Sequence, residues 1–145
     1  MDKKDFLIIK QLRKNSRQSL TNISETTKIP VTTVYDRMKN IFSKMINKHT
    51  CLVNYPALGL NGRAHIALRI EHSTRMPLQN YLLEHKNVNA LYIINYGYDL
   101  LLEVVFKDLG EIKNFVENLN MNFNIVSVQI HHIIDELQRE SFLTK

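Results

Sequence analysis

The sequence predicts an α+β fold in which a helical first third precedes a part that mixes strands and helices. Three observations lead to this prediction. Apolar residues recur at helical spacing up to about residue 44, short apolar runs separated by glycine and proline follow, and the excess positive charge lies in the first third. A chain of 145 residues suits one ordinary domain or two small ones.

The composition is typical of a globular protein. Hydrophobic residues make up 44% and charged residues 23%, and no apolar run approaches the roughly 20 residues of a membrane span. The N-terminus alternates charged and apolar residues without a small-residue cleavage site, so we expect a cytoplasmic protein without a secretory signal. The single cysteine, Cys51, excludes an internal disulfide and a thiolate metal cluster, and we expect it to be packed.

Charge is distributed unevenly along the chain. Residues 1–50 contain eleven Lys or Arg and four Asp or Glu, which gives +7, whereas residues 51–145 contain eight and ten, which gives −2. A basic part joined to a mildly acidic one suggests a polyanion-binding head on a partner-binding or sensing body. On charge alone, a basic surface that only meets solvent remains the alternative.

Three short helices are predicted in the first domain, over about residues 2–14, 19–27 and 31–43. Ser19 suits the N-cap of the second helix, because its hydroxyl can accept a hydrogen bond from a free backbone N–H. Pro30 suits the start of the third, where a missing N–H is tolerated. The residues expected to face the shared core are Ile8, Ile9, Leu12, Leu20, Ile23, Thr27, Val31, Val34, Met38 and Ile41.

The opposite face of the third helix is short and polar. It carries Thr32, Asp36, Lys39 and Ser43, with Thr33, Tyr35 and Asn40 on its flanks. Such a face can enter a DNA major groove and meet base edges and phosphates. Two helices joined by a tight turn within a basic three-helix unit therefore favour a helix-turn-helix, although solvent would accept the same polar residues.

The second part of the chain has the order strand, helix, strand, strand, helix, strand, which is the ferredoxin-like βαββαβ arrangement. A helix is expected to begin at Pro77, and two apolar runs form a hairpin hinged at Gly97. The predicted domains are residues 1–50 (helix-turn-helix), 51–62 (a short strand and linker) and 63–145 (ferredoxin-like).

The predicted helix-turn-helix resembles that of the leucine-responsive and asparagine-regulator (Lrp/AsnC) family. The positions that match in spacing are Ser19, Asn22, Ile23, Ser24, Thr27, Ile29, Arg37 and Ile41. The resemblance implies that Thr32, Thr33 and Asp36 approach bases. It also implies that Tyr35, Arg37 and Lys39 approach backbone phosphates, and Asn40 completes the predicted DNA-binding set.

Three positions of the helix-turn-helix depart from the family pattern. Lys28 stands where a small residue, often glycine, is usual, and a positive φ there would destabilise the fold by about 1 kcal/mol relative to glycine. Pro30 replaces a serine or threonine cap, and Met45 replaces a glycine after the third helix.

For the second domain the resemblance implies the family's RAM-type oligomerisation and effector-binding module. Such modules dimerise, associate further to tetramers or octamers, and bind an amino-acid-like effector near a hairpin with a G-x-[YH]-D signature. The sequence here reads YGYD, so Tyr98 and Asp99 align, whereas Gly97 comes one place late and Tyr96 takes the usual glycine position. These four residues are the predicted effector site.

Other chemistry finds little support. No catalytic residues, metal site or cofactor is predicted, and we expect no enzyme. His65 and His132 could approach each other across paired strands, but packed or surface imidazoles explain them better than metal ligands. We therefore expect a sequence-specific, dimeric or larger DNA-binding transcriptional regulator, with double-stranded DNA, a second copy and an amino-acid-like effector as partners.

Two alternatives stay open. One is a low-specificity DNA-organising protein that needs no effector. The other is a sensor or interaction protein whose helix-turn-helix docks on another protein.

Overall fold

The computed structural model describes residues 2–145, which divide into two compact units. Residues 2–52 together with residues 137–145 form the helical unit, and residues 53–136 form the sheet unit. The chain therefore passes between the units twice, after residue 52 and after residue 136.

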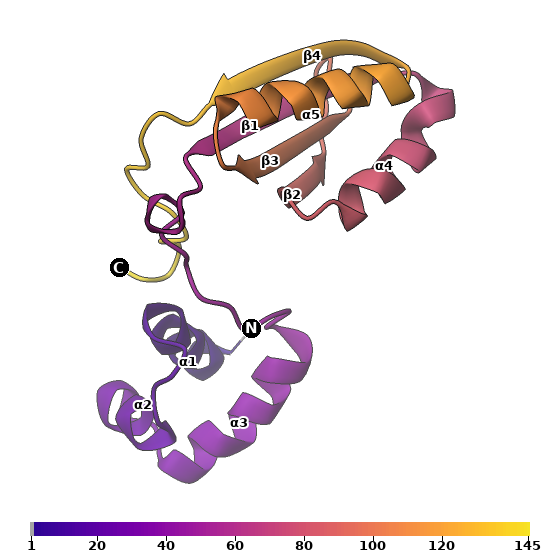
Figure 1. Ribbon diagram of the computed structural model, residues 1–145. Coiled ribbons are helices and arrows are strands. Elements are labelled where there is room, and N and C mark those ends of the chain that lie inside the picture. The colour runs from indigo at the N-terminus through magenta and orange to yellow at the C-terminus, as the bar shows by residue number, and fades with distance from the viewer. Residues whose placement is uncertain (1) are drawn as a thin grey trace. The chain divides into compact units, whose positions relative to one another are not determined.

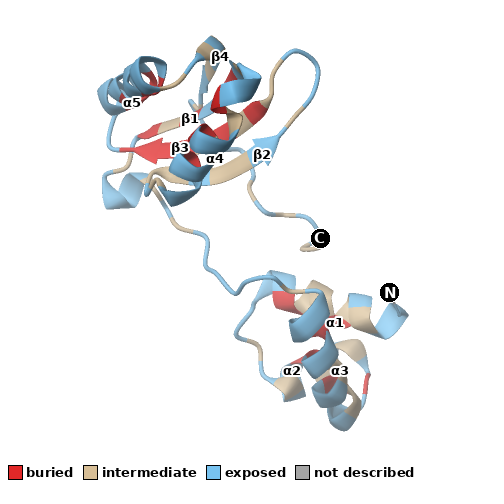
Figure 2. Ribbon diagram, turned by 90° about the vertical axis from the view of Figure 1, so that its right-hand side faces the viewer, coloured by how far each residue is buried: buried red, intermediate tan, exposed pale blue. Residues whose placement is uncertain are grey.

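The helical unit contains α1 (Lys3–Lys14), α2 (Leu20–Thr27) and α3 (Val31–Lys44). Its core forms where the apolar stripes of the three helices meet, as the buried residues in Figure 2 show. Removing these side chains from water is the main force that holds such short helices together. The buried members are Ile8, Leu12, Ile23, Ile29, Val34, Met38 and Ile41.

Local chemistry sets the ends of these helices. The Asp2 carboxylate accepts a hydrogen bond from the Lys4 N–H, and the Ser19 hydroxyl accepts one from the Asn22 N–H, so both act as N-caps. Lys28 ends α2 at φ 58°, so a non-glycine residue adopts a positive φ at this position. Pro30 precedes α3 without a side-chain cap, and α3 ends at Met45 with φ −121°, not in a left-handed turn.

The sheet unit has the predicted ferredoxin-like order of elements (Figure 1). All strand pairs are antiparallel in the spatial order β2-β3-β1-β4. The elements are η1 (Pro56–Leu58), β1 (Gly62–Ile70), η2 (His72–Thr74), α4 (Arg75–Glu84), β2 (Val88–Ile93), β3 (Leu100–Phe106), α5 (Leu109–Asn122) and β4 (Ile125–His132).

Helices α4 and α5 cover one face of this sheet. Alternate residues of β1 and β3 point toward them, and no member of this core is more than 8% exposed, because every second side chain of a strand shares one face. The core consists of Ala64, Ile66, Leu68, Leu78, Leu82, Leu100, Leu102, Val104, Phe106, Ile112, Phe115, Val116 and Leu119.

The structure corrects several details of the sequence prediction. Residues 51–61 contain no strand, and the first strand begins at Gly62. Helix α4 begins at Arg75, which places Pro77 inside its first turn, where the missing N–H leaves no hydrogen bond unmade. Val31, the first residue of α3, is 43% exposed and so does not belong to the core that the sequence predicts for it.

Two more differences concern long-range placement. His65 pairs with His131, not with His132, which lies opposite Ala64 and faces the helices. The last nine residues, 137–145, group with the helical unit although the sequence assigned them to the second domain. A strand's pairing partner and a tail's contacts depend on tertiary packing, which local sequence patterns do not specify.

Candidate nucleic-acid interface

Helix α3 presents a polar face on the outside of the helical unit. Val34, Met38 and Ile41 are buried against α1 and α2, and this fixes the rotation of the helix. On the other side, Thr32, Tyr35, Asp36, Lys39 and Asn40 are exposed and Thr33 is half-buried. The structure thus brings all predicted DNA-contacting residues except Arg37 and Thr33 to the exposed surface of one helix.

The turn before α3 is held by hydrogen bonds from small polar side chains of α2. The Ser24 hydroxyl donates to the Ile29 carbonyl at 2.6 Å, and the Thr27 hydroxyl donates to the Ile23 carbonyl at 2.6 Å. Ile29 itself is buried between the helices. The Ser24 bond and the buried Ile29 hold the turn against α2, whereas the Thr27 bond lies within α2 itself. A turn held in this way sets the direction in which a recognition helix begins.

Arg37 is engaged inside the helical unit. Its Nη1 lies 2.6 Å from Asp2 Oδ2 and 2.8 Å from Asp5 Oδ1, so the guanidinium joins α3 to the start of α1. The hydrogen bonds to Asp5 and then Asp2 raise the pKa of Arg37. In turn, the Lys4 backbone N–H and then Arg37 hold the pKa of Asp2 below its ordinary value. The positive charge of Arg37 is therefore balanced by two carboxylates.

Sequence reasoning did not identify Asp2 and Asp5 as the partners of Arg37. Acidic residues early in a helix are explained by the helix dipole alone. Their contact with Arg37, which is 32 residues from Asp5 along the chain, follows from how α1 packs on α3.

Lys39 and Asp36 remain available on the outer face. The Lys39 ammonium lies 4.5 Å from the centre of the Tyr35 ring, one helical turn earlier, and this cation–π contact holds both side chains along the helix. Within residues 2–145, Asp36 forms no ion pair of 4.0 Å or less. An exposed carboxylate with this freedom can accept a hydrogen bond from a cytosine amino group.

The predicted effector residues lie in the loop between β2 and β3. The Ile94 N–H donates to the Asp99 carbonyl and closes the loop. Tyr96 and Gly97 both have positive φ, 61° and 93°, and Tyr96 is 95% exposed. A tyrosine thus adopts the left-handed conformation that glycine would adopt without strain.

Asp99 has a structural role in the same loop. Its Oδ2 accepts a hydrogen bond from the Ile70 N–H at 2.9 Å, and its own N–H donates to the Leu68 carbonyl at 2.8 Å. Asp99 therefore ties the hairpin to the end of β1, while Tyr98 is half-buried beside it.

The described residues offer no other reactive site. Within residues 2–145 there is no group of three or more His, Cys, Asp or Glu side chains placed to hold a metal ion. No helix in the same range is long and apolar enough to cross a bilayer. Cys51 is exposed, not packed as the sequence suggested.

Comparison with known proteins agrees with this geometry. Residues 1–40 match the family described as winged helix-turn-helix DNA-binding. The transcriptional regulator FL11 of Pyrococcus furiosus is 26% identical over 144 residues, covering 94% of this chain and 95% of FL11. FL11 of Pyrococcus abyssi is 27% identical over 118 residues, covering 81% and 78%.

Solved structures share the whole fold. LrpC of B. subtilis superposes with a TM-score of 0.86 at 21% identity, over 95% of this chain and 97% of LrpC. An AsnC family regulator of Agrobacterium tumefaciens gives 0.85 at 16% identity, over 96% and 94%. The chain therefore has the fold of these Lrp and AsnC regulators and is similar in sequence to HTH-type transcriptional regulators. A third structure, the Neisseria meningitidis regulator NMB0573 in complex with L-Met, gives 0.88 at 19% identity, over 96% and 93%.

Residues 2–52 of this chain contain helices and no strand, so this segment presents α3 without a β-wing of its own. The outer face of α3 is the polar helix surface of the DNA-binding module.

Proposed function

We propose that this regulator binds DNA as a homodimer, with α3 of each subunit in one of two successive major grooves, about 34 Å apart. The observation that supports this is the exposure of the polar face of α3 while its apolar face is locked in the core. The side chains proposed to read bases are Thr32, Thr33, Asp36 and Asn40, and those proposed to contact phosphates are Tyr35 and Lys39. We also propose that the protein is cytoplasmic.

For Arg37, a phosphate contact stays a prediction. The two carboxylates that hold its guanidinium favour a role in fixing α3 against α1. A phosphate would have to replace or join these partners.

The test compares Lys39→Ala with a charge-matched control, Lys86→Ala, on an exposed residue between α4 and β2. Affinity for a promoter fragment is measured over a salt series. Removing one phosphate contact should weaken binding and reduce the salt slope by about one unit in Lys39→Ala only. Equal behaviour of the two variants would contradict the assignment of α3.

Sequence preference is tested with Asp36→Ala on the promoter fragment and on unrelated duplexes. If Asp36 reads a base, its removal should change the ranking of sites, because a specific base interaction contributes about 1 to 3 kcal/mol of discrimination. A uniform gain on every duplex would show that Asp36 only repels phosphate. Similar wild-type affinity for all duplexes would favour the low-specificity DNA organiser.

The dimer is proposed to form through the sheet face opposite α4 and α5. Leu101 lies on this face in the inner strand β3, where it pairs with Ala67 on one side and with Tyr92 on the other. It is half-buried and Tyr92 is exposed, and an antiparallel sheet with helices on one face leaves the other free to pack. A second copy would cover these side chains.

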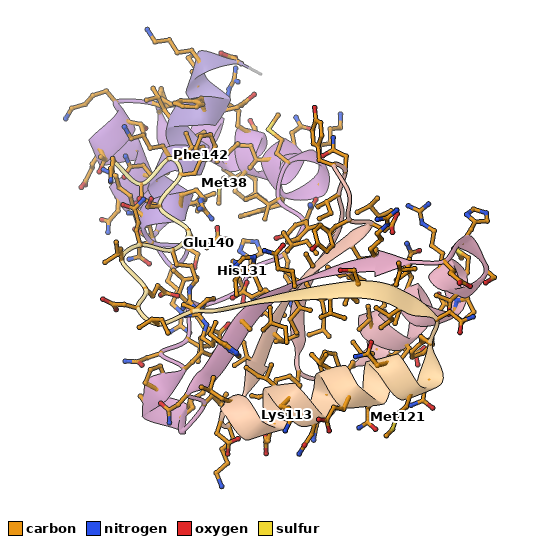
Figure 3. The ribbon with its side chains drawn as sticks, turned by 90° about the horizontal axis from the view of Figure 1, so that it is seen from above. Met38, Lys113, Met121, His131, Glu140 and Phe142 are labelled. Atoms are coloured by element: carbon orange, nitrogen blue, oxygen red, sulfur yellow. The ribbon has the colours of Figure 1, made fainter. Side chains whose placement is uncertain are left out.

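Light scattering tests the proposed dimer face. Leu101→Glu should yield monomers, whereas Met121→Glu, on the exposed side of α5, should leave the assembly unchanged (Figure 3). Circular dichroism confirms that each variant is folded. Unchanged assembly of a folded Leu101→Glu variant would place the interface elsewhere.

An amino-acid-like effector is proposed to bind near the loop of Tyr96, Gly97, Tyr98 and Asp99. The bound L-Met named for the similar Neisseria meningitidis structure supports this class of ligand. The test measures the melting temperature of the protein in the presence of each of a panel of amino acids, including methionine. An effector should raise the melting temperature, because a ligand that binds the native state stabilises it. No shift with any of them would contradict the proposal.

A further inference from the structure

The C-terminal tail, residues 137–145, packs within the helical unit. Arg13, in the last turn of α1, holds it with three hydrogen bonds. Its Nε donates to the Phe142 carbonyl at 3.1 Å, and its Nη2 donates to the Glu140 carbonyl at 2.9 Å and to Glu140 Oε2 at 3.1 Å. Figure 3 shows Glu140 and Phe142 on this tail beside the helices.

The tail is folded on itself, not extended. The Thr144 N–H and hydroxyl both donate to the Ser141 carbonyl, at 3.1 and 2.8 Å, and the Lys145 ammonium donates to Gln138 Oε1 at 3.1 Å. Glu140 has a φ of 53°, a value that non-glycine residues rarely adopt. Such a conformation persists where surrounding contacts determine it, and here both the carbonyl and the carboxylate of Glu140 reach Arg13.

The groups that hold Arg13 resemble a phosphate in chemistry. A carboxylate and two carbonyl oxygens accept from the guanidinium donors that would otherwise bind a backbone phosphate. The ion pair is partly solvated, with side chains 35% and 56% exposed, so it is weak and can be displaced. While it forms, the basic helical unit has one fewer free positive charge for DNA.

We propose that the C-terminal tail is an internal competitor of DNA for Arg13. In the free protein Glu140 neutralises Arg13, and a phosphate must displace the tail before it can bind there. The inference rests on the DNA-binding function proposed above and adds to it a site on α1 and a segment that controls access to that site.

The test uses Glu140→Gln, which removes the charge and keeps the size of the side chain. The matched control is Asp135→Asn, the same change five residues earlier, where the structure records no bond to Arg13 among the described residues. Promoter DNA binding is measured over a salt series for both, alone and combined with Arg13→Ala. Wild type and Arg13→Ala serve as references.

Glu140→Gln should bind about two- to fivefold more tightly near 0.1 M salt, the factor that corresponds to an exposed ion pair. Its salt slope should be close to that of the wild type, because Arg13 contacts one phosphate in both complexes, and both slopes should be steeper than that of Arg13→Ala by about 0.9. In the Arg13→Ala background this gain should disappear. Equal effects of Glu140→Gln and Asp135→Asn, a gain that survives Arg13→Ala, or weaker binding by Glu140→Gln would each overturn the proposal.

A measurement without DNA separates this inference from the proposed function. The Nε–H of Arg13, bonded to the Phe142 carbonyl, should exchange slowly with solvent in the NMR spectrum of the free protein. It should exchange rapidly in a variant that ends at Glu136. If the wild-type Nε–H is unprotected, the tail contact is absent and the proposal fails, whereas protection without any DNA binding would contradict only the proposed function.

Discussion

At the scale of single residues, Lys28 and Arg37 differ in how far the sequence determines their roles. Lys28 follows α2 at the start of the three-residue connection to α3, and its φ of 58° is the left-handed value common just after a helix. A lysine there retains a positive charge at the expense of backbone strain. Arg37 matches the helix-turn-helix pattern in the sequence, but the packing of α1 on α3 determines which carboxylates it contacts.

Replacing Lys28 with glycine should raise the free energy of unfolding by up to about 1 kcal/mol, because glycine adopts a positive φ without a Cβ clash. Chemical denaturation of the wild type and of the variant measures this difference in the free energy of unfolding. The control is Lys10→Gly, within α1, which should lower stability by about 1 kcal/mol. If both substitutions destabilise equally, the backbone at Lys28 is not strained.

The Arg37 contact predicts non-additive effects on stability. Arg37→Met and Asp5→Asn should each lower the melting temperature, and the double variant should be more stable than the sum of the two separate decreases implies, because both remove the same ion pair. Additive decreases would show that the two side chains do not interact in solution. Salt should reduce the coupling.

At the scale of elements, the start of β1 and the start of α5 touch closely. A Cβ on Gly62 would lie 2.4 Å from the Asp108 carbonyl oxygen, and Asp108 is the N-cap of α5, accepting a hydrogen bond from the Glu111 N–H. A hydrogen bond from the Asn61 N–H to the Lys107 carbonyl also joins the segment before β1 to the segment before α5. Backbone meets backbone here, so a larger residue would have to move a helix.

Gly62→Ala should therefore lower the free energy of unfolding by about 1 to 3 kcal/mol, the usual range for overpacking. The control is Gly110→Ala in α5, whose Cβ would meet only the Asp108 side chain at 3.1 Å. Helix propensity should make that variant neutral or up to about 1 kcal/mol more stable. A neutral Gly62→Ala would mean that the two segments can separate without a loss of stability.

At the scale of the whole molecule, each unit has its own core, and His85 shows how three elements of the sheet unit are joined. His85 is the C-cap residue of α4. The centre of its ring lies 4.8 Å from that of Phe115 in α5 and 6.2 Å from that of Phe106 in β3. Burial, and then the positive charge of Lys86, lowers the pKa of His85. The folded state therefore favours the neutral ring, whose Nδ1 accepts from the Asn87 N–H.

This lowered pKa predicts that acid weakens the sheet unit. The unfolded chain binds a proton at His85 near pH 6.5, above the folded pKa, so stability is complete above that pH and falls as pH drops below it. Thermal melts at pH 7.5 and 5.5 should show a smaller loss for His85→Phe than for wild type. His72→Asn, an exposed histidine of η2, should behave like wild type, and the same pH dependence in His85→Phe would assign the effect to other groups.

The sequence alone determined the order of the elements, except for the expected strand after residue 51, which the structure does not contain. Helix and strand spacing of apolar residues and the positions of glycine and proline are local properties. The sequence also identified the polar face of α3, since helical geometry fixes which side chains oppose the core. Tertiary structure alone decided that Arg37 meets Asp2 and Asp5, that His65 faces His131, and that the tail binds Arg13. Those contacts join residues far apart in the chain, and their geometry exists only after the elements pack.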